Sequence, residues 1–543
     1  MPSANALSFL DLAIIVVSLG LTVFVGLWAS RRHERTASGY FLASNRLKWW
    51  LIGPSIVATS VSSEQIVGTI GAAYQHGMGI ANWEWWTLPT YTLVMAFFIP
   101  MYLRNRVVTV PEYFSRRFGP LCADLYSWVM LAAYVVVFLV PVLYGGSLTF
   151  AHLTGTSFQL VLWLSVALVA VYTIRGGLES VMWTNLLQTI LLVGGGLVLY
   201  FIVLAKVPGG WSAMVAANPQ RFHLYRPPGD RIAPFPALMC LSVGLGLFYQ
   251  GTSQIMIQRI LGARSVWDGI MGTIFAGFIN FIRPLVTCFL GFVVYHWIHE
   301  LHRAEPFPPG QADRAFPFAL AHMAPAWGIR GVVLAGFLAA VLSTVSSLVN
   351  STAALFSLDV YKKLIHPAAD ERSTVRVGQI ASLGALVLAA LLAPAVERFG
   401  GIFQYFQTLV TYTATPFISV MLVGLFWRRA NYPGGLVGLI GGAVIQAVVV
   451  ASAYVFLRDP APGGGLRIHW LYLGFIAQVL TMFLVVAVSL ATPPPRPERY
   501  ETMIWRPAWL AEYASAPLPW YKQLWLWYAV YAAIWFYLYW RFW

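Results

Sequence analysis

One apolar stretch of the chain carries many side chains that could bind a cation or a polar solute. Residues 53–71 read GPSIVATSVSSEQIVGTIG. Eight polar residues lie in this stretch, namely Ser55, Thr59, Ser60, Ser62, Ser63, Glu64, Gln65 and Thr69. A helix interrupted inside a membrane exposes carbonyl oxygens and helix ends, which can hold ions and polar solutes. The composition of this stretch favours such an interruption.

A second stretch with the same potential lies farther along the chain. Residues 242–254 read SVGLGLFYQGTSQ and contain Gly244, Gly246 and Gly251. Counted along the apolar stretches, these are the second and the seventh, so they lie five apart. An inverted repeat of five helices would give that spacing, although glycine alone is common in membrane helices.

Two charged residues fall inside apolar stretches as well. Arg283 stands directly before Pro284, and Glu84 lies in the stretch 81–103. A charged side chain is costly in a bilayer, so each needs a partner or water, and each is a functional candidate.

The composition shows which elements must position these groups. Of 543 residues, 59% are hydrophobic and 10% are charged; a soluble protein carries about 25% charged residues. The mean hydropathy is +0.70. This composition is typical of a polytopic membrane protein and excludes a soluble enzyme, a disulfide-stapled secreted domain and a nucleic-acid-binding domain.

The apolar runs predict 14 membrane spans of about 20 residues each. They lie near 8–29, 47–74, 81–103, 121–150, 157–174, 179–204, 235–260, 270–298, 328–364, 374–396, 401–427, 434–457, 468–491 and 522–541. The first run lacks a basic flank and a cleavage site, so we expect a retained helix. The last run is dense in Trp and Tyr, which favour the membrane interface, and we expect a peripheral helix anchored in lipid.

The basic residues predict the orientation of the chain. One set of alternate loops holds 22 Lys and Arg residues and the opposite set holds 11. Cytoplasmic loops carry the excess of basic residues, so we expect both termini outside. Most of the net charge of +14 is then a topology signal. The compact loops favour a bacterial inner-membrane protein.

Six strings, in order across about 50–440, resemble the sodium:solute symporter family, nearest its sodium/sugar branch. They are SVSSEQIVG at 60–68, RGGLESVMWTNLLQ at 175–188, QIMIQRILGARS at 254–265, FLAAVLSTVSSLVNSTAALFSLDVY at 337–361, IFQYFQTLVTY at 402–412 and GLFWRRANYPGG at 424–435.

This resemblance implies an all-α fold of the leucine-transporter type, with two inverted five-helix repeats. One helix would precede the core and three would follow it. The implied parts are an N-terminal helix and loop at 1–46, core repeat 1 at 47–204, an extracellular loop at 205–234, core repeat 2 at 235–430 and three C-terminal helices at 431–543.

The resemblance also implies a sodium site made of neutral oxygens. The implied ligands are the carbonyls of Ala58, Val61 and Ala340 and the hydroxyls of Ser343 and Thr344. Positions 340, 343 and 344 share one helix face, so their oxygens can converge. The alternative for each hydroxyl is a bond back to its own helix.

The sequence departs from the family pattern at a second sodium site. The family string WTD reads Trp183-Thr184-Asn185 here. Ser346 and Ser347 keep the two hydroxyls of that site, but Asn185 lacks the negative charge that would offset a second buried cation. We therefore expect one sodium ion per cycle.

The substrate pocket implied by the resemblance contains polar residues from five core helices, namely Gln65, Glu84, Thr87, Tyr249, Asn280 and Gln407. Gates are implied at Trp83, Tyr249 and Phe403. Glu64 is either a pocket residue or a structural support. The alternative for Glu84 is a structural pair with a neighbouring helix.

Two positions of the implied pocket depart from the sugar branch. Gly246 stands in place of an asparagine, and Asn280 stands in place of a lysine. Arg283 follows one turn later. It either pairs with Glu64 or Glu84, or it receives a carboxylate of the substrate through its bidentate fork.

We expect a transporter, not an enzyme, that couples inward sodium flow to uptake of a small polar solute, a sugar first. Sodium is the coupling ion and no cofactor is expected. The partners are the solute, sodium and the lipid bilayer, with the chain a monomer or a weak homo-oligomer. The alternatives are a sodium-coupled symporter of an organic anion such as a uronate, a sialate or another carboxylate, and a non-transporting solute sensor. A channel and a membrane enzyme are disfavoured, and coupling to protons through Glu84 stays open.

Overall fold

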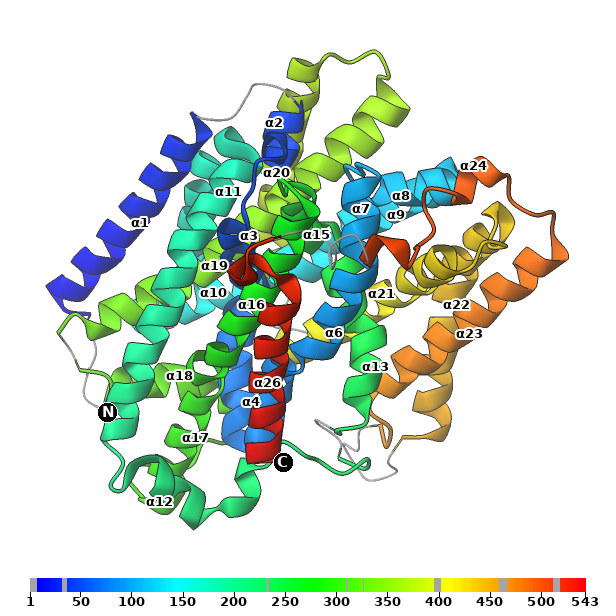
Figure 1. Ribbon diagram of the computed structural model, residues 1–543. Helices are drawn as coiled ribbons and strands as arrows, with labels where there is room; N and C mark the ends of the chain where they lie inside the picture. The colour runs from blue at the N-terminus through cyan, green and yellow to red at the C-terminus, as the bar shows by residue number, and fades with distance from the viewer. Residues whose placement is uncertain are drawn as a thin grey trace.

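The fold is built from helices that cross one another at the centre of the molecule (Figure 1). The computed structural model describes residues 7–31, 37–230, 234–308, 311–325, 327–394, 402–458, 466–510 and 518–543. Within these ranges the only β-type pairings are two isolated bridges.

The helices of the first half are α1 (Phe9–Ser30), α2 (Ala37–Leu42), α3 (Trp49–Ser60), α4 (Thr69–His76), α5 (Asn82–Trp85), α6 (Thr87–Leu93), α7 (Ile99–Arg104), α8 (Val110–Arg117), α9 (Pro120–Ala133), α10 (Val140–Thr154), α11 (Phe158–Ala205) and α12 (Gly210–Ala217). Those of the second half are α13 (Ala237–Val243), α14 (Leu245–Leu247), α15 (Gln254–Leu261), α16 (Val266–Thr287), α17 (Phe289–Tyr295), α18 (Ala315–Phe318), α19 (Ile329–Ala354), α20 (Glu371–Leu392), α21 (Ile402–Phe426), α22 (Tyr432–Phe456), α23 (Trp470–Ala491), α24 (Pro497–Tyr500) and α26 (Leu524–Phe542).

Ten helical segments of the described chain are long and apolar enough to cross a membrane. The other four predicted spans are not among these ten. Spans 47–74 and 235–260 are interrupted, and Phe158–Val171, the part of the helix in span 157–174 whose side chains the structure describes, is shorter than a full span. The last predicted span, 522–541, is helical as α26, but its Trp and Tyr rings carry polar atoms that lower its hydropathy. The structure therefore supports a multi-pass membrane protein without establishing the predicted number of 14 spans.

Both stretches that the sequence marked as interrupted are broken in the structure. The first helix stops at Ser60, and Val61 is extended at φ −112° and ψ 121° before a π-helical turn starts at Glu64. The second is broken twice, at Gly244 and at Ser253, and Ser253 is extended at φ −77° and ψ 124°. These breaks free backbone carbonyls that an unbroken helix would use internally.

A corner inside α11 joins two of the predicted spans, 157–174 and 179–204. Gly177 adopts φ +56° there, and a Cβ atom at this position would lie 2.6 Å from the carbonyl oxygen of Tyr40. Glycine is thus required both by the turn and by the close approach of the neighbouring backbone.

The helices that carry the candidate site cross at the centre. α3 packs against α11, α16 and α19, and α11 packs along α19. Small residues permit close contact: a Cβ atom on Gly336 of α19 would lie 2.7 Å from the carbonyl oxygen of Leu191 on α11. α1 lies at one edge of the molecule and α22 and α23 at the opposite edge (Figure 1). The division of the core into two repeats stays a prediction.

Candidate functional site

Five oxygens that the sequence analysis grouped together meet where α19 crosses the break after α3. The Ser343 hydroxyl lies 2.7 Å from the carbonyl oxygen of Ala58 and 2.8 Å from that of Ala340. The Thr344 hydroxyl lies 3.1 Å from the carbonyl oxygen of Val61 and 3.3 Å from that of Ala340. We call these five residues the oxygen cluster.

The cluster holds more acceptors than its own protons can satisfy. The carbonyl oxygen of Thr59 also approaches Thr344, at 3.2 Å. Each hydroxyl has one proton to donate, so two protons face four carbonyl oxygens. The surplus of neutral oxygens, held by a rigid crossing of two helices, is the donor set that a hard monovalent cation prefers. The residues present therefore fit a sodium ion.

Asn185 lies behind this cluster in a second group of polar side chains. Its Nδ2 is 2.8 Å from the hydroxyl of Ser55, 3.3 Å from that of Thr59 and 3.4 Å from that of Ser347. Its Oδ1 has no hydrogen-bond partner among the described residues. Ser346, predicted beside Ser347, donates instead to the carbonyl oxygen of Ser343 at 3.0 Å. An amide nitrogen thus occupies the point where three hydroxyl oxygens converge.

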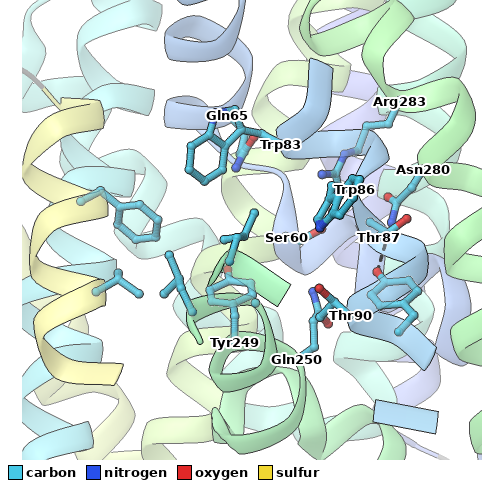
Figure 2. A pocket seen from close by; sticks show the side chains of 16 residues that line it. Ser60, Gln65, Trp83, Trp86, Thr87, Thr90, Tyr249, Gln250, Asn280 and Arg283 are labelled. Carbon is cyan, nitrogen blue, oxygen red and sulfur yellow. Dashed lines mark hydrogen bonds between the residues drawn. The ribbon is translucent and has the colours of Figure 1, made fainter. Parts of the chain in front are cut away.

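A cavity opens beside the break and holds about 820 Å³ of space free of atoms (Figure 2). It is lined by residues of α3, α5, α6, α13, α14, α16 and α21 and of the turns beside them, namely Ser60, Gln65, Trp83, Trp86, Thr87, Thr90, Tyr91, Leu241, Leu245, Gly246, Tyr249, Gln250, Asn280, Arg283, Phe406 and Val410. Hydroxyls, carboxamides and aromatic faces together suit a small polyhydroxylated molecule.

Most of the predicted pocket residues face this cavity. Gln65, Thr87, Tyr249 and Asn280 line it, and so does Trp83, which stacks on Trp470 at a centroid distance of 5.6 Å. The side chains of Glu64, Phe403 and Gln407 lie outside the described part of the chain. Their roles stay predictions.

Glu84 does not line the cavity. Its side chain is fully buried and forms an ion pair with Arg283, which stands between it and the cavity. Arg283 also donates to the hydroxyl of Ser60 at 2.9 Å, at the end of α3. Of the two alternatives for Arg283, the structure therefore shows the pair with Glu84, and its charge is already compensated.

One of the two departures from the sugar branch, Gly246, has a steric explanation. A Cβ atom at Gly246 would lie 2.8 Å from the carbonyl oxygen of Leu241 and 3.0 Å from the Thr90 hydroxyl, so no asparagine fits there. Asn280 donates to the Tyr91 hydroxyl at 3.1 Å, and its Oδ1 has no hydrogen-bond partner among the described residues. That oxygen is a buried acceptor on a residue that lines the cavity.

The sequence analysis missed five polar or aromatic lining residues, Ser60, Trp86, Thr90, Tyr91 and Gln250. A signal was present for three of them. Trp86, Thr90 and Tyr91 follow Trp83 at positions i+3, i+7 and i+8, which form one stripe of a helix. Trp86 belongs to this stripe in the sequence, although it leaves the helix at φ −74° and ψ 39° in the structure.

Comparison with known proteins agrees with this geometry. The model of the sodium:solute symporter family matches residues 40–442. The chain is 32% identical over 459 residues to a sodium/glucose cotransporter of Vibrio parahaemolyticus, covering 80% of this chain and 84% of that protein. It is 28% identical to sodium/myo-inositol cotransporter 2 of Homo sapiens, covering 91% and 78%.

The fold matches a substrate-bound outward-open state of a Na+-coupled sialic acid symporter, with a TM-score of 0.79 at 22% identity, over 90% of this chain and 99% of that one. The family match covers well over half of the chain, and the fold and the oxygen cluster agree with it. The protein is therefore a member of the sodium:solute symporter family.

Proposed function

We propose that this protein couples the inward flow of one sodium ion to the uptake of a neutral polyhydroxylated solute, a sugar or a cyclitol. One observation carries the proposal: the oxygen cluster and the cavity share the break after α3. Ser60 lines the cavity, while the carbonyl oxygens of Thr59 and Val61, on either side of Ser60, belong to the cluster or border it.

This shared break supplies a physical route for coupling. Sodium held between Ala58, Val61 and α19 would fix the position of the α3 end, and with it Ser60 and Arg283 at the wall of the cavity. Coupling requires that the ion binds the outward-open and inward-open states with different affinities. The ion would favour the outward-open state, and its release inside would let the solute follow, by alternating access within the two inverted repeats.

The buried Glu84–Arg283 ion pair is the reason for proposing a solute without net charge. Because Glu84 compensates Arg283, the cavity wall offers hydroxyls and carboxamides and no free cation among the described residues. The named solutes of the two relatives, glucose and myo-inositol, are neutral and rich in hydroxyls.

A second candidate is sodium-coupled uptake of an organic anion. Arg283 does line the cavity, and the structural neighbour is named for sialic acid. A carboxylate could compete with Glu84 for the guanidinium. The cost of leaving Glu84 without its partner makes this the weaker candidate.

The replacement of Asn185 by aspartate tests the proposed stoichiometry. The carboxylate would supply the missing charge beside the hydroxyls of Ser55, Thr59 and Ser347. We expect the sodium dependence of uptake to change from hyperbolic to sigmoidal, with a Hill coefficient that rises from about one towards two. Gln188→Glu is the matched control, because Gln188 lies one turn along α11 and has no hydrogen-bond partner among the described residues. An equal change in both variants would argue against a latent second site.

The remaining expectations belong to the same proposal. The family membership and the ten candidate spans support a multi-pass membrane protein that moves sodium and a small solute, with no cofactor expected. We propose an inner-membrane location with both termini outside, and a monomer or weak homo-oligomer.

The proposal is tested by uptake into proteoliposomes under an imposed inward sodium gradient. The labelled panel is D-glucose, D-galactose, myo-inositol, D-glucuronate and sialate. We expect accumulation of at least one neutral solute that disappears when potassium replaces sodium. Accumulation of acids alone would favour the anion candidate, and sodium-dependent binding without accumulation would favour a sensor.

A further inference from the structure

The last helix, α26, forms hydrogen bonds with residues 82–92, a stretch that carries much of the pocket wall. The composition of α26 had predicted a peripheral helix anchored in lipid. α26, drawn in red in Figure 1, packs against α16 and α6. Tyr531, Trp535 and Tyr539 are buried, whereas Trp525 and Trp540 on other faces are 65% and 77% exposed. Only one side of α26 is therefore available to lipid.

The buried side of α26 makes four hydrogen bonds to one stretch of chain, residues 82–92. Tyr528 and Tyr531 contact the hydroxyls of Thr92 and Thr87, each at 2.7 Å. Trp535 Nε1 donates to the Trp85 carbonyl oxygen, and Tyr539 donates to Asn82 Oδ1, each at 2.8 Å. The four residues 528, 531, 535 and 539 form one helical stripe. We call this set the aromatic ladder.

The ladder brackets the break between α5 and α6. Trp86 is not helical, so the carbonyl oxygen of Trp85 lacks a partner within its own helix. Trp535 satisfies that oxygen on one side of the break, and Tyr531 holds the Thr87 hydroxyl on the other. Glu84, Trp86 and Thr87 all lie at this break, so Trp535 and Tyr531 are the two ladder residues that flank the ion-pair carboxylate and two cavity residues.

α26 approaches α16 closely at one glycine of α16. A Cβ atom at Gly277 would lie 2.6 Å from the ring of Tyr531. Gly277 stands one turn before Asn280, which lines the cavity. A small residue at this point lets the aromatic helix contact the helices that form the pocket.

We propose that Tyr531 is a positioning residue for the solute site, acting through the hydroxyl of Thr87; the proposal rests on the transport function proposed above. Thr87 lines the cavity and is bonded to Tyr531. The bond fixes the direction of the Thr87 hydroxyl, and the remaining hydrogen-bonding capacity of that hydroxyl faces the solute. The last helix of the chain thereby determines how the solute is recognised.

The test compares two tyrosines of the same helix. Tyr531→Phe removes the hydroxyl and keeps the ring, and Tyr528→Phe does the same where the partner, Thr92, does not line the cavity. The probe is whichever of D-glucose and myo-inositol the unaltered protein takes up with sodium. We expect Tyr531→Phe to raise the KM for that solute by about 2- to 10-fold, with the sodium half-saturation unchanged. Tyr528→Phe should leave the KM for the solute unchanged.

A double variant separates positioning from stability. Thr87→Val removes the same bond from the other side, so Tyr531→Phe should add nothing to KM in its presence. Should Tyr531→Phe fail to fold, Trp535→Phe, which removes the bond to the Trp85 carbonyl and reduces the ring that contacts Trp86 and Tyr539, is expected to raise KM in the same direction. Equal KM values for Tyr531→Phe and Tyr528→Phe, or additive effects with Thr87→Val, would overturn the inference. An unaltered protein with no sodium-dependent uptake would instead overturn the proposed function.

Discussion

Replacement of Thr344 by alanine is expected to remove most sodium-driven uptake at physiological sodium. The change deletes one of the five oxygens of the cluster and the contact with the Val61 carbonyl at the break after α3. A hydrogen-bonding contact to a charged group contributes about 1.5 to 3 kcal/mol. The sodium concentration for half-maximal uptake should therefore rise by about 10- to 150-fold. It is measured from initial rates of labelled solute uptake at increasing sodium.

Thr352→Ala is the matched control for this variant. Thr352 is also buried on α19, but its hydroxyl donates to the carbonyl oxygen of Leu348 in its own helix, at 2.9 Å. We expect this variant to keep the sodium dependence of the unaltered protein. If both threonine variants shift the sodium dependence equally, the effect is one of helix packing, and the oxygen cluster is not the ion site.

Separation of the Glu84–Arg283 pair should have the second large effect. Glu84→Gln leaves a buried guanidinium without its counter-charge, at a cost of about 3 to 5 kcal/mol. We expect a lower melting temperature in detergent and little or no uptake. The double variant Glu84→Gln with Arg283→Gln removes both charges and shortens only the Arg283 side chain, so it should recover most of the stability.

Arg116→Gln serves as the control, because Arg116 forms its ion pair with Glu112 at an exposed site. Exposed pairs contribute about 0 to 1 kcal/mol, so the melting temperature should barely change. An unchanged melting temperature in Glu84→Gln would show that the buried pair is not structural. If Arg283→Gln loses the uptake of acids and keeps the uptake of neutral solutes, Arg283 would instead be the receptor for an anionic substrate.

The sequence predicted the elements of this site because its signals are local. The polar residues of 53–71 predicted an interruption in that stretch, which the structure has at Val61, and the spacing of Ala340, Ser343 and Thr344 predicted a shared face. Both predictions depend only on residues that lie within one or two helical turns of each other. The structure confirms that these residues converge, while the ion itself stays a proposal.

The features that the sequence did not reveal depend on contacts between distant segments. The partner of Arg283 was one of two alternatives, because 199 positions separate it from Glu84 and no helical period relates them. Similarly, the aromatic composition of α26 is equally typical of a lipid-facing helix. Its contacts with Thr87 and Asn82, more than 440 positions away, follow only from the fold. Gly246 was recognised as a departure, but the steric cause required the position of Thr90.

The most direct test of the central claim is the number of charges moved with each solute molecule. Solute-induced current and labelled solute uptake would be measured in the same proteoliposomes at a fixed sodium gradient. One sodium ion with a neutral solute predicts one positive charge per solute molecule, and none in the absence of sodium. A ratio near zero would indicate a monovalent anion carried with one sodium ion, and a ratio near two would indicate a second cation beside Asn185. Either result would contradict the account.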